Sequence, residues 1–348
     1  IAKTYKHKIG VTFDPAHVRV LLNRIERSAI KAPVDAKFEP ESDLSVKVLD
    51  SHPGIKLNAT LTARRMTTAG LQVGATARAA RIAFALDRAR FTTKQARALG
   101  VTNVVGYATT DMGVSSPNRI VNVHLMADIL NGYRIEPGAT FSFNQAVGPR
   151  TAGRGFLEGQ AIENGLLVPS IGGGVCQVAT TIFDASLVGG YPIDIRQNHS
   201  FYIDHYPTGL DATVADGGPD FSFTNDTKNV IVVQTSYTDQ TLTVQLLSAP
   251  VNRTSVLTPG TPQNYTNPKK RYVFDPTVPP DTMVQQTLGE RGFDFEVTQT
   301  ITPKDGGDPI VNVFRSRYIP EDIVFDVGKG MKLPKGAVLE PAPVPSNT

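Results

Sequence analysis

Residues 172–183, GGGVCQVATTIF, contain three glycines, the only cysteine of the chain two positions after the last of them, and an apolar pattern that begins at Val175. The apolar residues recur at the i, i+3, i+4, i+7 and i+8 spacing of one buried helix face. They are Val175, Val178, Ala179, Ile182 and Phe183. The spacing predicts a helix that begins near Cys176 and is stopped by Gly189-Gly190. A thiol at a helix N-terminus lies close to unpaired backbone N–H groups and to the positive end of the helix dipole, and both favour the thiolate.

The composition is that of a globular protein with two or three domains. The chain has 348 residues, of which 40% are hydrophobic and 19% charged. No run of about eighteen apolar residues is present to span a membrane. The net charge is +3 and the Lys and Arg residues are scattered, which argues against a nucleic-acid partner. A lone cysteine excludes an internal disulfide and leaves a thiol free to react.

Helical and alternating patterns are mixed along the chain, which predicts an α+β fold. Early in the chain we expect a helix from Asp14-Pro15, a hairpin over residues 34–48, a helix over residues 75–86 and a short helix capped by Thr92. A further helix is predicted to begin at Asn118. Residues 191–206, YPIDIRQNHSFYIDHY, alternate and are predicted to form a strand, with His199 on it or beside it. Antiparallel strands joined by Asp, Gly and Asn turns then continue to residue 248.

Shifts in composition divide the chain into five parts. We expect a mixed α/β module over residues 1–112, a central α+β domain over 113–248, a Pro-, Thr- and Asn-rich linker over 249–270, a small all-β module over 271–328, and a tail over 329–348. The first residue is Ile1, so we expect any membrane contact to be made through an anchor segment that this chain lacks.

The stretch around Cys176 has the residue types that acyl transfer needs. A nucleophilic cysteine requires a lowered pKa, a nearby base and donors for the developing oxyanion. The candidate donors are the backbone N–H groups of Val175, Cys176 and Gln177, and Gly172, Gly173 and Gly174 let a substrate carbonyl approach because they have no Cβ. The candidate bases are His199 and His205, and the carboxylates that could orient an imidazole are Asp204, Asp211 and Asp216.

Other interpretations remain open for the same residues. Cys176 could be a small buried hydrophobic residue, and the glycines could form only a tight turn. The run is not a phosphate-binding loop, because no lysine follows at the required spacing. A metal site formed by Cys176 with His199, His205 and Asp204 lacks any recognised spacing. We therefore expect neither a metal nor a cofactor.

Several ordered motifs between residues 118 and 225 resemble the VanW-like domain family. They are NRIVNVHLMADILNG, PGATFSFNQAVGPRT, GGGVCQVATTIFDASL, the NHS of residues 198–200, and GLDATVADGGPDFSFTN. The region before them, including TTKQARALGV, is similar to the peptidoglycan-binding module that often precedes VanW domains. Residues 271–328 resemble the G-five type of cell-wall β module through FEVTQTITPKDGG and YIPEDIVFDVG.

This resemblance implies a bacterial cell-wall L,D-transpeptidase that works outside the cytoplasm, in the wall or facing it. Cys176 would attack a peptidoglycan stem peptide, and the acyl group would pass to an amine of a neighbouring stem. The histidine of the family maps onto His199, which would act as general base and then as general acid. Arg196 and Ser200, which flank it, are the expected substrate contacts, and the glycan is a further expected partner. Two alternatives are a non-catalytic peptidoglycan-binding scaffold and a cysteine peptidase that transfers the acyl group to water.

Overall fold

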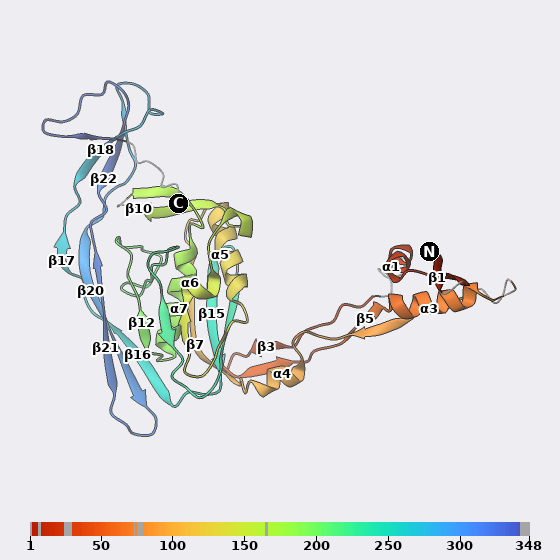
Figure 1. Ribbon diagram of the computed structural model, residues 1–348. Coiled ribbons are helices and arrows are strands. Elements are labelled where there is room, and N and C mark those ends of the chain that lie inside the picture. The colour runs from red at the N-terminus through yellow and green to blue at the C-terminus, as the bar shows by residue number, and fades with distance from the viewer. Residues whose placement is uncertain are drawn as a thin grey trace. The chain divides into compact units, whose positions relative to one another are not determined.

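The computed structural model describes residues 2–5, 8–23, 30–72, 74, 79–163 and 166–341. Helices are combined with mainly antiparallel sheets, which confirms the predicted α+β class (Figure 1). The chain forms two compact units, one of residues 1–42 with 46–100 and one of residues 43–45 with 101–348. Within the described ranges, no helix has both the length and the apolar character needed to cross a membrane.

The first unit is built from short hairpins and helices. Its strands pair as β1 (Ala2–Tyr5) with β2 (Lys8–Val11), β3 (Lys37–Pro40) with β4 (Val46–Leu49), and β5 (Gly54–Leu57) with β6 (Phe84–Asp87). Its helices are α1 (Pro15–Leu21), α3 (Ala59–Gly70) and α4 (Thr93–Ala98). The predicted hairpin and the Asp14 and Thr92 caps are confirmed.

The helix predicted over residues 75–86 is wrong at its C-terminal end. Residues 84–87 are strand β6, because their backbone groups pair with β5, and this pairing outweighs the helix propensity of Ala and Arg. Residues 75–78 lie outside the described part of the chain.

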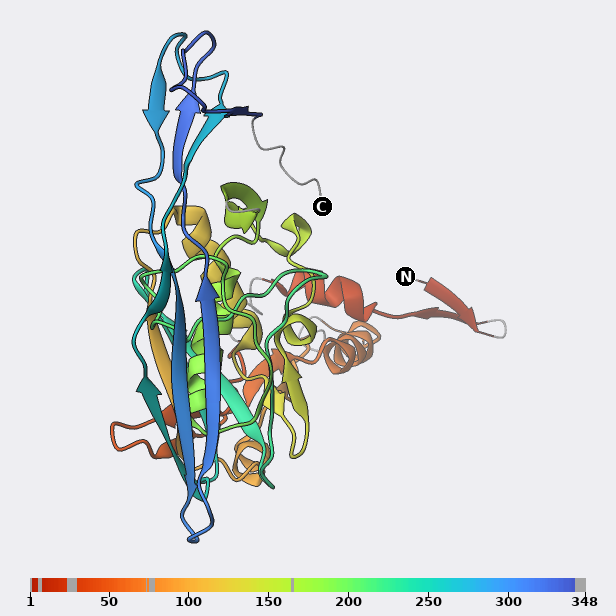
Figure 2. The ribbon, with the colours of Figure 1, turned by 90° about the vertical axis from the view of Figure 1, so that its left-hand side faces the viewer.

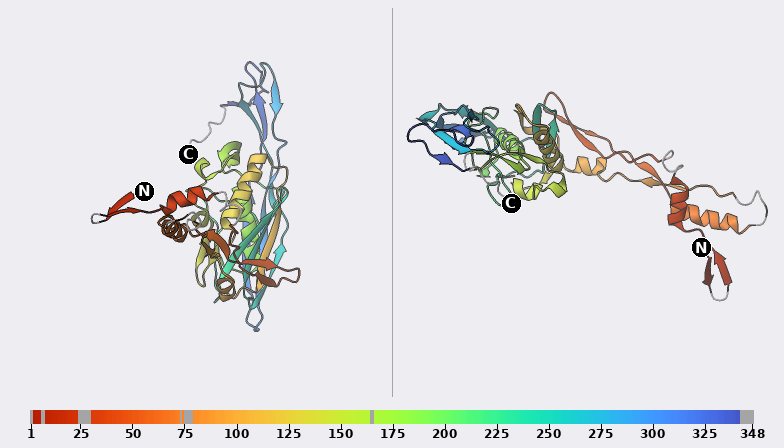
Figure 3. Two further views of the ribbon diagram at one scale, coloured as in Figure 1. Left: turned by 90° about the vertical axis from the view of Figure 1, so that its right-hand side faces the viewer. Right: turned by 90° about the horizontal axis from the view of Figure 1, so that it is seen from above.

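The centre of the second unit is helix α7 (Val175–Val188), and its residues 177–187 are all buried. It packs on an antiparallel sheet of order β7 (Asn103–Asp111), β15 (Thr241–Ser248), β14 (Ile231–Tyr237) and β8 (Arg134–Ile135). Helix and sheet approach closely at Gly106, where an added Cβ would lie 2.2 Å from the Ala185 carbonyl oxygen. Helix α5 (Pro117–Leu130) packs against α7 and β14, and Figure 3 (left) shows the unit from its side.

Smaller elements surround this core. A three-stranded sheet has the order β12 (Ile193–Ile195), β13 (Ser222–Thr224), β9 (Thr140–Ser142). The connection before α7 contains α6 (Phe143–Val147), the 3₁₀ helix η2 (Ala152–Arg154) and the hairpin of β10 (Glu158–Glu163) and β11 (Leu166–Ile171). The strand predicted over residues 191–206 is therefore wrong beyond Ile195, and His199 lies on a loop.

The C-terminal part forms two further sheets. The first joins β16 (Arg253–Pro259), β20 (Gly292–Pro303), β21 (Ile310–Tyr318) and β17 (Gln263–Thr266), and Figure 2 shows the long strands β20 and β21 side by side. The second has the order β19 (Met283–Gln285), β22 (Ile323–Val327), β18 (Lys270–Phe274), β23 (Leu339–Glu340).

Residues 249–270, predicted to be a linker, contribute strands β16 and β17 to the first of these sheets. This sheet is hydrogen-bonded to the end of α7, because the Ser255 hydroxyl and the Gln299 amide both donate to the Leu187 carbonyl, at 2.6 and 2.9 Å. The tail predicted over residues 329–348 includes β23, and residues 342–348 lie outside the described part. The C-terminal sheet thus belongs to the same compact unit as Cys176.

Candidate active site

The three glycines form a tight turn that starts helix α7. Gly172 and Gly174 have φ angles of 82° and 100°, in the left-handed region that side chains rarely adopt. An added Cβ at Gly174 would lie 2.6 Å from Cγ of Arg119, so glycine is also required by packing there. The Gly173 carbonyl accepts a hydrogen bond from the Asn122 amide at 3.0 Å. The turn places Cys176 in the first turn of the helix, as predicted, with its side chain half-buried.

Cys176, His199 and Asp211 form one connected set of side chains. Nδ1 of His199 lies 2.6 Å from Oδ2 of Asp211. The imidazole and the Cys176 thiol interact so that each shifts the pKa of the other, and Nε2 is the ring nitrogen that Asp211 leaves free for the thiol. The thiol also donates to the Val214 carbonyl at 3.4 Å, and its sulfur lies 3.5 Å from the Val214 backbone nitrogen. This order of nucleophile, imidazole and carboxylate matches the arrangement of a cysteine or serine acyl-transfer enzyme.

The surroundings of this set favour a thiolate beside an imidazolium. Burial alone would raise the pKa of Cys176, but its hydrogen bond to His199 and the charges of His199 and Arg150 outweigh that effect and lower it. Burial alone would lower the pKa of His199, but the hydrogen bonds to Asp211 and Cys176 outweigh it and raise the pKa to about 9. Both shifts favour the charged pair.

Asp211 is buried and accepts four hydrogen bonds. Its Oδ2 accepts from the backbone N–H of His199 as well as from the imidazole. Its Oδ1 accepts from the Tyr318 hydroxyl at 2.6 Å and from Nη2 of Arg196 at 3.2 Å. Burial opposes the charged form, but the contacts with His199 and Arg196 outweigh it and hold the pKa of Asp211 below its usual value. Of the three candidate carboxylates, Asp211 is the one that contacts His199.

Arg196, a predicted substrate contact, is enclosed by protein groups. Its side chain is buried, and it donates to the carbonyls of Asp211 and Gly209 and to the Ser316 hydroxyl at 2.7, 3.1 and 2.9 Å. These contacts hold the Arg196 guanidinium against Asp211. Ser200 is exposed, and the contact described for it is its backbone carbonyl, which accepts from the Ile319 N–H at 2.8 Å.

His205 and Asp204 lie apart from this set. The Asp204 side chain is 89% exposed and lies 3.6 Å from Nδ1 of His205. Nε2 of His205 lies 3.4 Å from Nη2 of Arg119, and burial together with the Arg119 charge lowers the pKa of His205. Asp216 instead forms an ion pair with Arg150 at 2.8 Å.

The candidate oxyanion donors differ in whether their protons are available. The N–H groups of Val175 and Gln177 donate to the carbonyls of Gly172 and Gly174, at 3.3 and 3.1 Å. The Cys176 N–H has no acceptor among the described residues. The Gln177 side chain is fully buried and bonded to Arg119, Thr110 and the Asp111 carbonyl. It therefore holds the helix start in place and does not face an open site.

Sequence reasoning missed three residues of this region: Arg150, Tyr206 and Tyr318. The positive charge of Arg150 acts on the thiol, and Gly172 packs against its side chain. Tyr206 is buried, its ring lies 5.7 Å from that of His199, and burial raises the pKa of its hydroxyl. Arg150 lies in the quoted motif PGATFSFNQAVGPRT and Tyr318 begins YIPEDIVFDVG, but neither motif indicated a role for its residue at the site, whereas Tyr206 could have been noticed as an aromatic neighbour of His205.

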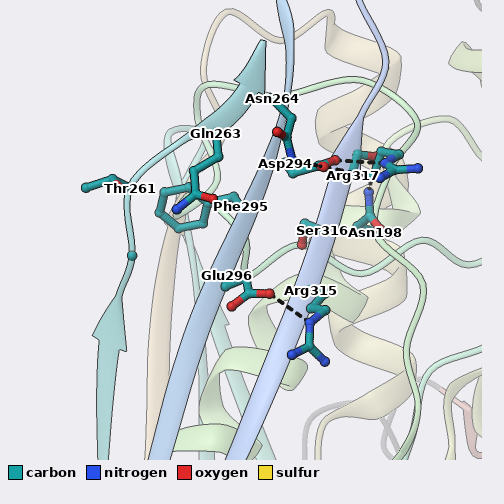
Figure 4. Close-up of a pocket in the computed structure, with 11 residues that line it drawn as sticks. Asn198, Thr261, Gln263, Asn264, Asp294, Phe295, Glu296, Arg315, Ser316 and Arg317 are labelled. Atoms are coloured by element: carbon teal, nitrogen blue, oxygen red, sulfur yellow. Dashed lines mark hydrogen bonds and ion pairs between the residues drawn. The ribbon is translucent and has the colours of Figure 1, made fainter. Parts of the chain in front are cut away.

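A polar cleft of about 450 Å³ lies beside the His199 loop (Figure 4). It is lined by residues of strands β20 and β21, by Asn198, and by Gly260, Thr261, Gln263 and Asn264. Asn198 donates to the carbonyls of His199 and Arg317, at 2.7 and 2.9 Å. The loop that carries His199 is thereby bonded to β21. Among the described residues, no group of three or more His, Cys, Asp or Glu side chains could hold a metal ion.

Comparisons with known proteins agree with the motifs of the central domain. Residues 118–247 match a family described as VanW like protein. The chain is 35% identical over 150 residues to Uncharacterized protein YoaR of Bacillus subtilis, which covers 43% of this chain and 50% of that protein. It is 30% identical over 138 residues to Vancomycin B-type resistance protein VanW of Enterococcus faecalis, which covers 38% of this chain and 50% of that protein. The chain thus matches about half the length of these curated relatives.

These findings confirm the VanW-like domain predicted from the motifs, with bounds of 118–247. The resemblance of residues 1–112 to a peptidoglycan-binding module, and of residues 271–328 to the G-five type, stays a prediction.

Proposed function

We propose that the VanW-like domain of this protein is a cysteine acyltransferase that cross-links peptidoglycan stem peptides, as an L,D-transpeptidase does. The observation that carries the proposal is the connected set of Cys176, His199 and Asp211, with a half-buried thiol whose pKa is lowered. A purely structural cysteine has no need of a buried imidazole bonded to a buried carboxylate, and burying such charged groups is costly.

The chemistry can be written step by step from these residues. The Cys176 thiolate adds to the carbonyl carbon of an amide bond in the donor stem, and the carbonyl oxygen takes the negative charge. The His199 imidazolium gives its Nε2 proton to the leaving amine, the C–N bond breaks, and a thioester to Cys176 remains. The Cys176 N–H is the available backbone donor for the oxyanion.

Transfer to the acceptor restores the starting state. An amine of a neighbouring stem attacks the thioester, and Nε2 of His199 takes the proton that this amine loses. The C–S bond then breaks, which leaves a new amide cross-link, the thiolate and the imidazolium. Asp211 keeps the imidazole oriented through Nδ1 and stabilises its charge in both steps.

The choice of peptidoglycan as substrate is supported by the relatives. One of them is named as a vancomycin resistance protein, which indicates a cell-wall context. We therefore place the protein outside the cytoplasm, with stem peptides and glycan as its partners. The family resemblance of the central motifs points to the same reaction class.

The test is to incubate the protein with purified disaccharide tetrapeptides and to analyse the products by mass spectrometry. We expect cross-linked dimers with the parent protein and none with Cys176→Ala, because no other cysteine is available as nucleophile. Val188→Ala, at the opposite end of α7 and partly exposed, serves as the matched control and should retain dimer formation.

Other outcomes would identify the alternative functions. Shortened monomers without dimers would mean that the acyl group passes to water and that the protein is a peptidase. Dimers that persist in Cys176→Ala would refute the nucleophile. A protein that binds the muropeptides but leaves them unchanged, and whose thiol alkylates like an ordinary cysteine, would be a scaffold.

A further inference from the structure

The hydroxyl of Tyr318, at the end of β21, is bonded to the buried carboxylate that orients His199. We propose that Tyr318 is a positioning residue of the active site, through which the C-terminal sheet controls how strongly Asp211 supports the His199–Cys176 pair. The inference rests on the proposed roles of these two residues. It assigns the C-terminal sheet a part in the chemistry, beyond any part in wall binding.

The contact is direct and enclosed on both sides. The Tyr318 hydroxyl donates to Oδ1 of Asp211 at 2.6 Å and accepts from the Gly209 N–H at 3.1 Å. Tyr318 is 3% exposed and Asp211 is 2% exposed, so water does not compete for the hydrogen bond. The tyrosine ring is fixed in turn by Phe293 and Tyr202, at 5.2 and 5.6 Å between ring centroids.

The second donor to Oδ1 also depends on β21. Arg196 donates to Asp211 and is itself bonded to the Ser316 hydroxyl and to the Arg315 carbonyl, at 2.9 and 3.3 Å. Oδ2 of Asp211 therefore accepts hydrogen bonds from His199. Oδ1 accepts from Tyr318 and from Arg196, which is itself bonded to β21. A carboxylate held at both oxygens cannot rotate away from the imidazole.

Two more titratable side chains interact with Asp211, namely Tyr206, the pKa of whose hydroxyl is raised by burial, and Asp184. Asp184 of α7 is buried, and its Oδ1 has no hydrogen-bond partner among the described residues. Burial, and next the negative charge of Asp211, raise the pKa of Asp184 well above its usual value, which favours the neutral form of this carboxyl. The charged groups around Asp211 are then Arg196 and His199, with Cys176 beyond the imidazole. The Tyr318 and Arg196 donors contact Asp211, whose charged form they stabilise, whereas the surroundings of Asp184 favour its neutral form.

The pH dependence of Cys176 alkylation by iodoacetamide tests the inference. In Tyr318→Phe the ring remains but the donor to Asp211 is lost, so the charged set is destabilised. A hydrogen bond to a buried charge contributes about one pKa unit to the group that it contacts, here Asp211, and the effect reaches Cys176 through His199. We therefore expect the alkylation midpoint to rise by up to about one pH unit, with rates up to about tenfold lower below both midpoints. The rate at high pH, where every thiol is ionised, should be unchanged. Ser316→Ala should shift the midpoint in the same direction by less.

Tyr202→Phe is the matched control. Its ring lies in the same aromatic cluster, but its hydroxyl bonds to Thr208 and not to Asp211, so its alkylation midpoint should equal that of the parent. A Tyr318→Phe protein with the parent midpoint would overturn the inference, even if its melting temperature fell. A parent thiol that titrates like an ordinary cysteine would overturn the proposed nucleophile together with this inference.

Discussion

The loop that carries His199 and the loop that carries His205 give two histidines of the same domain opposite properties. His199 is buried with Asp211 at 2.6 Å, and its pKa is raised to about 9. His205 is partly exposed, faces the Arg119 guanidinium at 3.4 Å, and its pKa is lowered. Burial disfavours the charged form of both rings. For His199 the contacts with Asp211 and Cys176 reverse this effect, whereas for His205 burial itself lowers the pKa and the Arg119 charge adds to it.

The comparison also shows that closeness in sequence does not identify the carboxylate that orients a histidine. Asp204 directly precedes His205, yet its side chain is 89% exposed, and solvent screens such a contact. Asp211 lies further along the chain but is buried against His199. We therefore expect the two loops to respond very differently to matched substitutions.

The largest effect is expected for the histidines themselves. His199→Ala removes the proposed acid and base, and should lower the rate of cross-linking by about 10²- to 10⁴-fold. It should also return the alkylation midpoint of Cys176 toward that of an ordinary thiol, about 8.5. His205→Ala should retain activity within about threefold, since this ring contacts neither Cys176 nor Asp211. An inactive His205 variant beside an active His199 variant would reverse the assignment.

The carboxylates should show a smaller contrast of the same kind. Asp211→Asn keeps the shape of the side chain but removes the charge that stabilises the imidazolium, and should lower the cross-linking rate by about 10²-fold or more. Asp204→Asn is the matched substitution at the exposed site, and its rate should equal that of the parent. Equal losses in the two variants, measured with the same muropeptide donor, would refute the pairing of His199 with Asp211.

The smallest effect concerns stability against pH. The pKa of His205 is lowered in the folded protein, so the unfolded chain binds the proton more readily. The free energy of unfolding that His205 contributes above about pH 6.5 is therefore lost as the pH falls. His205→Gln should therefore reduce the loss of unfolding free energy between pH 7 and pH 5, by less than about 1 kcal/mol because the ring is partly exposed. Urea unfolding at the two pH values measures this. An unchanged pH dependence would contradict it.

Local patterns predicted the helices of the central domain well. All five apolar residues of the α7 stripe are buried, and the helix ends at Gly189 as expected. For α5 the helix was predicted correctly but its cap was not. Ser116 is the N-cap, because Pro117 takes the first helical position, and the Asn118 side chain instead donates to the Glu158 carbonyl. Such features depend on neighbours within a few residues.

The site was only partly predictable, because its third member is fixed by contacts distant in sequence. The glycine turn and Cys176 follow from spacing, and the family motif indicated His199. Nothing near Asp211 distinguishes it from Asp204 or Asp216, since the preference comes from Arg196 and Tyr318. Residues 249–270 were mistaken for a linker because their Pro and Asn residues are typical of loops, whereas pairing with β20 organises the strands between them.

The Tyr318–Asp211 hydrogen bond joins residues 107 positions apart, and this separation has a consequence for folding kinetics. Contacts so distant in sequence form late, because a long loop must close before they contribute stability. During synthesis the nascent chain contains Cys176, His199 and Asp211 well before β21 exists. With Tyr318 in the role proposed for it, the proposed reactive form of the thiol would be completed only after the C-terminal sheet has docked, and a growing or truncated chain would carry an immature site.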